Sequence, residues 1–168
     1  MDGEKAKVAV EKLFEMDNFQ EEKKIQAVLY LAELETHRRY GEEFAGTQFH
    51  RKDGGPYSPE LAQLIEETQK KANSRWKERG NTLLNRKETQ VLEILGEGLG
   101  QLTTEEVLRR AKRTTPYLCA EEKAQIDFTT ILTYPEREEA LQKLFVRKGW
   151  KEKDSRKTKE PSIGVPCR

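Results

Sequence analysis

Apolar side chains recur at helical spacing along most of the chain, with charged residues between them. The segment from about Phe19 to Tyr40 carries two apolar stripes instead of one. The first stripe contains Ile25, Val28, Leu29 and Ala32, and the second contains Ala27, Leu31 and Leu34. A helix that is apolar on two faces is buried over much of its circumference. The pattern therefore predicts that this helix forms the centre of the core.

Helix-start and helix-stop signals divide the rest of the chain. A capping-box spacing, in which a capping residue precedes a glutamate by three positions, occurs at Asn18 and Glu21, at Asn85 and Glu88, and at Thr103 and Glu106. Gly41 predicts the end of the central helix. Ser58 and Pro59 predict the start of a helix that continues to about Glu78. Further helices are predicted through Cys119, Ala120, Ala124 and Phe128, and from Pro135 onward.

One short segment departs from the helical pattern. Phe49 and Tyr57 flank a turn signal at residues 52–55, which predicts a short β-hairpin or an extended arm. The expected fold is therefore mainly α, or α+β at most: a compact multi-helix domain with one small β-hairpin. We expect this domain to span residues 1–150. Residues 151–168 have no apolar period and predict a flexible basic tail.

The charge of the chain is balanced overall but unevenly distributed. Lys and Arg number 31 and Asp and Glu number 30, which gives a net charge of +1. From Arg147 onward, eight basic and three acidic residues give +5, which leaves −4 for the remainder. No stretch approaches the ~18 apolar residues that a membrane helix needs, and the first residues lack a long apolar run. We therefore expect a cytoplasmic protein with no membrane partner.

No recognisable catalytic set emerges from the sequence. A nucleophile–base pair would need His37 or His50 together with Ser58, Cys119 or a threonine, and none of the established catalytic motifs is present. Paired glutamates on helix surfaces are explained by solubility and by the helix dipole. Two cysteines and two histidines do not make a zinc constellation. The expectation is a protein that is not an enzyme and that uses no cofactor and no metal.

The segment from residue 85 to residue 117 supports a nucleic-acid hypothesis. Two capped helices flank a short connection, and the second carries Arg109, Arg110, Lys112 and Arg113. This is the outline of a helix-turn-helix with a basic second helix, and the basic tail would add phosphate contacts. The alternative is a solvated helix face followed by a disordered tail, and we favour it because no base-reading set of Asn, Gln and Arg is evident.

Aromatic residues gather around the predicted hairpin. Phe44, Phe49, Tyr57 and Trp76 lie in it or in the following helix. They would either attach the hairpin to the helices or form a partly exposed patch for a protein partner. The sequence does not separate these two interpretations.

The order of these features resembles the Panacea (SocA-like antitoxin) domain, with similarity to the YwgA-like proteins. The residues that match its first half are Lys24, Ile25, Leu29, Tyr30, Tyr40, Gly41, Gly46, Phe49, Gly55, Pro56 and Leu61. Thr115, Pro116 and Tyr117 match the end of its second half. The resemblance spans about residues 23–117 and implies a mostly helical fold with a small β element.

The function that this resemblance implies is binding, not chemistry. Members of the family, which is prokaryotic or phage-borne, neutralise a cognate toxin protein or act as proteolytic adaptors for it. We therefore expect an antitoxin-like interaction module, with a helix-turn-helix DNA-binding regulator as the alternative and nucleic acid as the less favoured partner. The residues expected to contact the partner are Phe44, Phe49, Gly55, Pro56, Tyr57, Arg109 and Arg113.

Overall fold

The computed structural model describes residues 1–16, 18–72 and 83–132. Its elements are α1 (Gly3–Glu15), α2 (Glu22–Tyr40), β1 (His50–Lys52), β2 (Gly55–Tyr57), α3 (Pro59–Ala72), α4 (Arg86–Gly100), α5 (Thr104–Lys112), α6 (Thr115–Cys119) and the short 3-10 helix η1 (Phe128–Leu132). The predicted fold class is confirmed, because helices dominate and the two strands form one small antiparallel hairpin. None of the described helices is long and apolar enough to cross a membrane.

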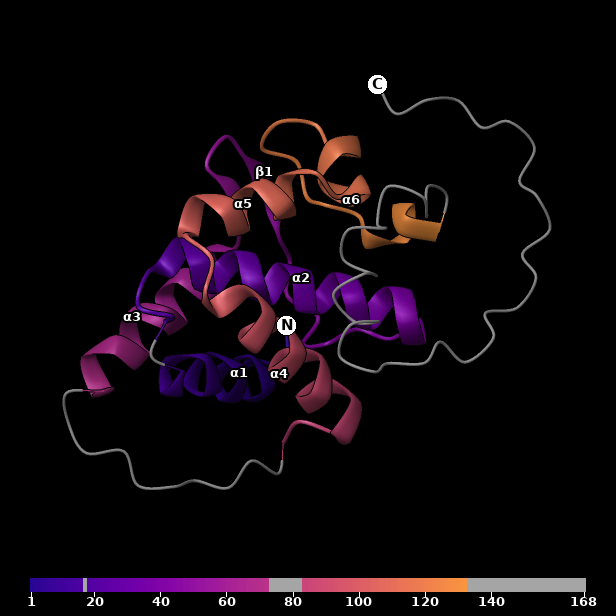
Figure 1. The fold of residues 1–168 in the computed structure, drawn as a ribbon. Helices are drawn as coiled ribbons and strands as arrows, with labels where there is room; N and C mark the ends of the chain where they lie inside the picture. Colours follow the sequence, from indigo (N-terminus) through magenta and orange to yellow (C-terminus); the bar gives the residue numbers. More distant parts are fainter. Residues whose placement is uncertain (17, 73–82, 133–168) are drawn as a thin grey trace.

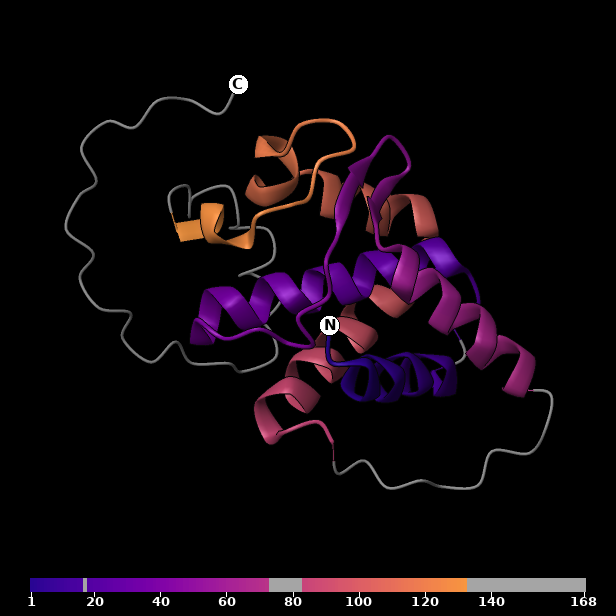
Figure 2. The same ribbon diagram turned by 180° about the vertical axis from the view of Figure 1, so that it is seen from behind.

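Helix α2 forms the centre of the molecule, as its two apolar stripes predict. Every residue from Lys24 to Thr36 is buried. The helix contacts α1, α3, α4, α5, β2 and η1. In Figures 1 and 2 it runs across the middle, with α1 on one side and with α5 and the hairpin on the other. Gly41 ends it in the left-handed conformation, at φ 67°, as predicted.

Two of the three predicted capping boxes are confirmed and one is wrong. Asn85 and Thr103 each cap their helix, with reciprocal bonds to Glu88 and Glu106. At the start of α2, Glu21 is the N-cap and makes no side-chain capping bond. The start of this helix is held instead by the buried Lys24, whose Nζ donates to the carbonyl oxygen of Asn18 at 2.9 Å.

The hairpin is fixed against α5 at its tip. Arg51 pairs with Pro56 and Lys52 with Gly55 in the ladder. Gly55 adopts φ 131°, and a Cβ placed on it would lie 2.6 Å from Leu108 Cδ2 of α5. The side chain of Lys112, also on α5, donates to the carbonyl oxygen of Asp53 in the turn. The glycine therefore provides both the backbone conformation and the space for this contact.

The helix predicted through Cys119 and Phe128 is wrong. Helix α6 ends at Cys119, and the following residues run beside β1 instead. Arg51 N donates to Ala124 O at 2.9 Å, and Ile126 N donates to Phe49 O at 2.8 Å. This pairing satisfies backbone groups along the open edge of the hairpin, which outweighs a local helical spacing. The expected helix from Pro135, the basic tail and the end of the helix expected to reach Glu78 lie outside the described residues.

Replacing Gly55 by alanine tests the contact between the hairpin and α5. We expect Gly55→Ala to lower the free energy of unfolding by about 1–3 kcal/mol, because φ 131° strains any residue with a Cβ. Gly54→Ala is the matched control, since a Cβ at Gly54 meets no atom within 4 Å. Urea denaturation followed by circular dichroism measures both. Equal losses in the two variants would contradict this account of the turn.

Candidate functional site

A buried carboxylate organises the loop that follows α2. Glu33, which is 2% exposed, accepts hydrogen bonds from four successive backbone amides. The donors are Phe44 N at 2.9 Å, Ala45 N at 3.1 Å, Gly46 N at 3.3 Å and Thr47 N at 3.4 Å. Gly46 has φ 61°, a conformation that glycine adopts without strain. The Glu33 carboxylate therefore holds the backbone of residues 44–47 in place through these four hydrogen bonds.

The electrostatics of Glu33 combine two opposing effects. Burial raises the pKa of its carboxyl above the ordinary value, and the four backbone N–H groups lower the pKa part of the way back. Both oxygens are already engaged by the loop. A carboxylate whose two oxygens both accept backbone hydrogen bonds is poorly suited to take a proton from a substrate, so the role of Glu33 is structural.

A cavity of about 430 Å³ opens beside this loop. Three segments form its walls: the last two turns of α2, residues 43–48 and residues 125–129. The lining side chains and backbone belong to Glu33, His37, Glu43, Gly46, Thr47, Gln48, Gln125, Ile126, Asp127, Phe128 and Thr129. Segments distant in sequence meet here because residues 123–126 run beside β1.

Aromatic rings pack around the cavity: His37 and Phe128 line it, and Tyr30 and Phe49 pack against Phe128. The Tyr30 ring lies 5.5 Å from that of Phe49 and 5.4 Å from that of Phe128, between ring centroids. The His37 ring follows at 6.1 Å from Phe128. Nδ1 of His37 is buried, and no described residue forms a hydrogen bond with it. A polar atom without a partner in a cavity wall is rare in folded proteins.

The described residues do not assemble a catalytic set around this cavity. His37 lines it, but His50, Ser58 and Cys119 do not. Asp127 Oδ1 accepts hydrogen bonds from the backbone and hydroxyl of Thr129, which closes a local turn. No group of three or more metal-binding side chains gathers in the part of the chain that the structure describes.

The expected patch of exposed aromatic residues is wrong. Phe44 is 2% exposed and Phe49 is fully buried, because both rings pack into the core around α2. Gly55 and Pro56 are buried as well, against α2 and α5. Tyr57 is half-buried, and Lys52 Nζ lies 3.3 Å from the centre of its ring. The hairpin residues predicted to contact a partner therefore do not form an exposed surface. Trp76 lies outside the described residues.

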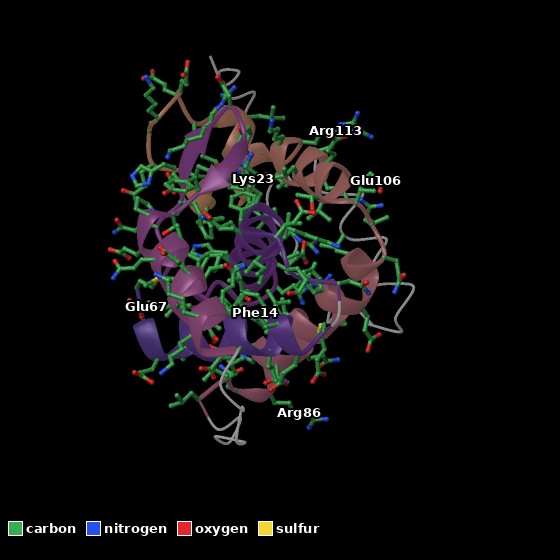
Figure 3. The ribbon with its side chains drawn as sticks, turned by 90° about the vertical axis from the view of Figure 1, so that its left-hand side faces the viewer. Phe14, Lys23, Glu67, Arg86, Glu106 and Arg113 are labelled. Carbon is green, nitrogen blue, oxygen red and sulfur yellow. The ribbon has the colours of Figure 1, made fainter. Side chains whose placement is uncertain are left out.

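Helix α5 does place the predicted arginines on the surface. Arg109, Arg110 and Arg113 are exposed. None of them joins an ion pair with another described residue. We call these three residues the arginine face. Figure 3 shows Arg113 at the opposite end of the molecule from Arg86.

The helix-turn-helix outline is present in part. Helices α4 and α5 are joined by residues 101–103, and both pack on α2. The first turn of α5, however, carries Glu105 and Glu106. In helix-turn-helix proteins this end of the second helix enters the DNA groove, and carboxylates there repel phosphate.

The sequence analysis missed the cavity and the role of Glu33. One signal was present: Glu33 lies between Ala32 and Leu34, in the middle of the doubly apolar helix, where a charged residue requires buried partners. The position of residues 123–126, which closes the cavity, has no comparable local signal because it results from pairing with a distant strand.

Glu33→Gln tests the organising role of the carboxylate. We expect the free energy of unfolding to fall by about 2–4 kcal/mol, because the amide turns a donor toward backbone N–H groups and leaves some of them unpaired. Hydrogen exchange of amides 44–47 should accelerate in parallel. Glu43→Gln is the control, since Glu43 is exposed on the same loop. A Glu33→Gln protein as stable as the control would show that the loop does not depend on this carboxylate.

Comparisons with protein-family models, with characterised proteins and with solved structures found no match to the chain. The resemblance to the Panacea domain therefore stays a prediction that rests on the residues quoted for it.

Proposed function

We propose that the chain is a non-enzymatic interaction module that binds a partner protein through the arginine face of α5. In line with the resemblance of its sequence, the proposed partner is a cognate cytoplasmic toxin, which the module neutralises or delivers to a protease. The observation that carries the proposal is a set of three exposed guanidinium groups that make no ion pair with any described residue.

The helix beneath these arginines is firmly anchored. Val107 and Ala111 are fully buried, and the capping box of Thr103 fixes the first turn. Leu108 packs against Gly55 of the hairpin. Arg109 and Arg113 are four residues apart, so they lie on neighbouring turns of one helix face. Because the backbone of this helix is already ordered, binding costs only the rotamer entropy of the arginine side chains, which favours a specific contact.

The charge distribution along α5 favours an acidic protein surface as the partner. Its last turn and C-cap are basic, while Glu105 and Glu106 make its first turn acidic. A protein surface can place carboxylates opposite the arginines and basic groups opposite the glutamates. The uniformly negative backbone of nucleic acid complements only one end of this helix.

The second candidate function is a DNA-binding regulator. The observation in its favour is the pair of helices α4 and α5, joined by three residues, with the arginine face on the second. In this case the affinity for duplex DNA would fall steeply with salt.

Members of the family that the sequence resembles are encoded beside their toxins, so the experiment compares two variants in a complex with the product of the neighbouring gene. We expect Arg109→Ala/Arg113→Ala to weaken the complex by at least about tenfold, because each arginine loses its charge-assisted bonds to the partner. Arg86→Ala is the control, since this exposed arginine lies at the far end of the molecule (Figure 3). Affinity is measured by calorimetry, and neutralisation by growth of cells that express both proteins.

Three outcomes would contradict the toxin-binding proposal. The first is that the neighbouring product forms no complex and shows no toxicity that the chain relieves. The second is that the complex forms, but the arginine variant and the control bind equally well. The third is that the chain binds duplex DNA at low salt and only the arginine variant loses this binding, which would establish the regulator instead.

A further inference from the structure

We propose that the cavity between α2, residues 43–48 and residues 125–129 binds a guanidinium group, either of a small molecule or of an arginine side chain. This goes beyond the proposed function, because none of the residues that line the cavity belongs to the arginine face. It holds whether that face binds a protein or DNA.

The charge of the lining selects a cation. Three acidic residues line the cavity from three different segments: Glu33 from α2, Glu43 from the loop and Asp127 from the segment before η1. No lysine or arginine is among the described residues that line it. Acidic groups around a concave surface focus a negative potential into it and raise the local concentration of cations.

Two of the three carboxylates are available to a ligand. Glu33 is buried and committed to the amides of residues 44–47. Glu43 and Asp127 belong to exposed residues. Asp127 uses Oδ1 for Thr129, and no described residue bonds to its Oδ2. These two residues line the same cavity from two different segments, so a cation bound in it can interact with both.

The remaining lining favours a flat cation with several donors. The rings of His37 and Phe128 stand 6.1 Å apart at an interplanar angle of 32° and contribute an aromatic wall. A guanidinium stacks on such rings and directs five N–H groups outward in its plane. Gln48 and Gln125 are exposed residues that also line the cavity, and an amide side chain offers an acceptor oxygen. A spherical ammonium would use fewer of these features.

The polar state and the size of the cavity agree with this assignment. His37 lines the cavity, and its buried Nδ1 has no hydrogen-bond partner among the described residues. The volume of about 430 Å³ falls in the range of small-ligand sites, which span about 300–1,000 Å³. An amino acid or the end of a side chain fits, whereas a nucleotide-sized anion would face three carboxylates.

The test is a titration of the full chain with L-arginine, followed by the amide resonances of residues 44–48 and 125–129 in NMR spectra. L-Citrulline is the matched probe, because it replaces the guanidinium by a neutral urea of the same shape. We expect saturable shifts of these amides with arginine and binding at least about tenfold weaker with citrulline, through loss of the charge-assisted bonds. A capped arginine tripeptide forms the second arm. Binding of the tripeptide identifies a protein side chain as the source, and binding of free arginine alone identifies a small molecule.

Two double variants separate the cavity from general charge effects. Glu43→Gln/Asp127→Asn should weaken arginine binding by at least about tenfold. The Asn side chain still offers Oδ1 to Thr129, so the local turn is kept. Glu42→Gln/Glu122→Gln removes the same charge from two exposed residues that lie near these segments in the sequence and do not line the cavity, and it should bind normally. Equal binding of arginine and citrulline, no saturable shift at these amides, or equal affinities of the two double variants would overturn the proposal.

Discussion

The enclosure of α2 is the constraint on which the rest of the structure depends. A helix buried on all sides is stabilised when the polar side chains that it carries find partners, because an unpaired buried polar group costs several kcal/mol. Lys24 donates to Gly100 O at the end of α4 at 2.8 Å. Gln26 accepts from Ser58 N at the start of α3 at 2.8 Å. Glu33 gathers the loop of residues 44–47. The polar residues of the central helix thereby determine where the surrounding segments sit.

Both candidate binding regions follow from this arrangement. Helix α5 packs on α2 through its apolar side and leaves its arginines on the outer side. The cavity forms at the other end of α2, where the loop around Glu33 meets residues 125–129. The first region is basic and exposed, and the second is an acidic cavity. The chain therefore carries two candidate binding regions of opposite charge around one central helix.

The sequence was informative at several places where the signal is local, although the capping box at Asn18 and Glu21 is an exception. The double stripe of α2, the capping boxes at Asn85 and Thr103, and the turn before Gly55 all depend on residues within a few positions of each other. Residues 120–127 were mispredicted because their conformation is decided by pairing with β1. The exposed aromatic patch failed for a related reason: Phe44 and Phe49 are buried by segments distant in the chain.

The central claim is that the module binds its partner through α5. Hydrogen–deuterium exchange of the chain, measured alone and with the product of the neighbouring gene, tests it most directly. The account predicts that protection on binding concentrates in residues 104–113 and the hairpin tip at residues 52–55, with no change in α1 or α3. Protection confined to α1 and α3, or none at saturating partner, would contradict it.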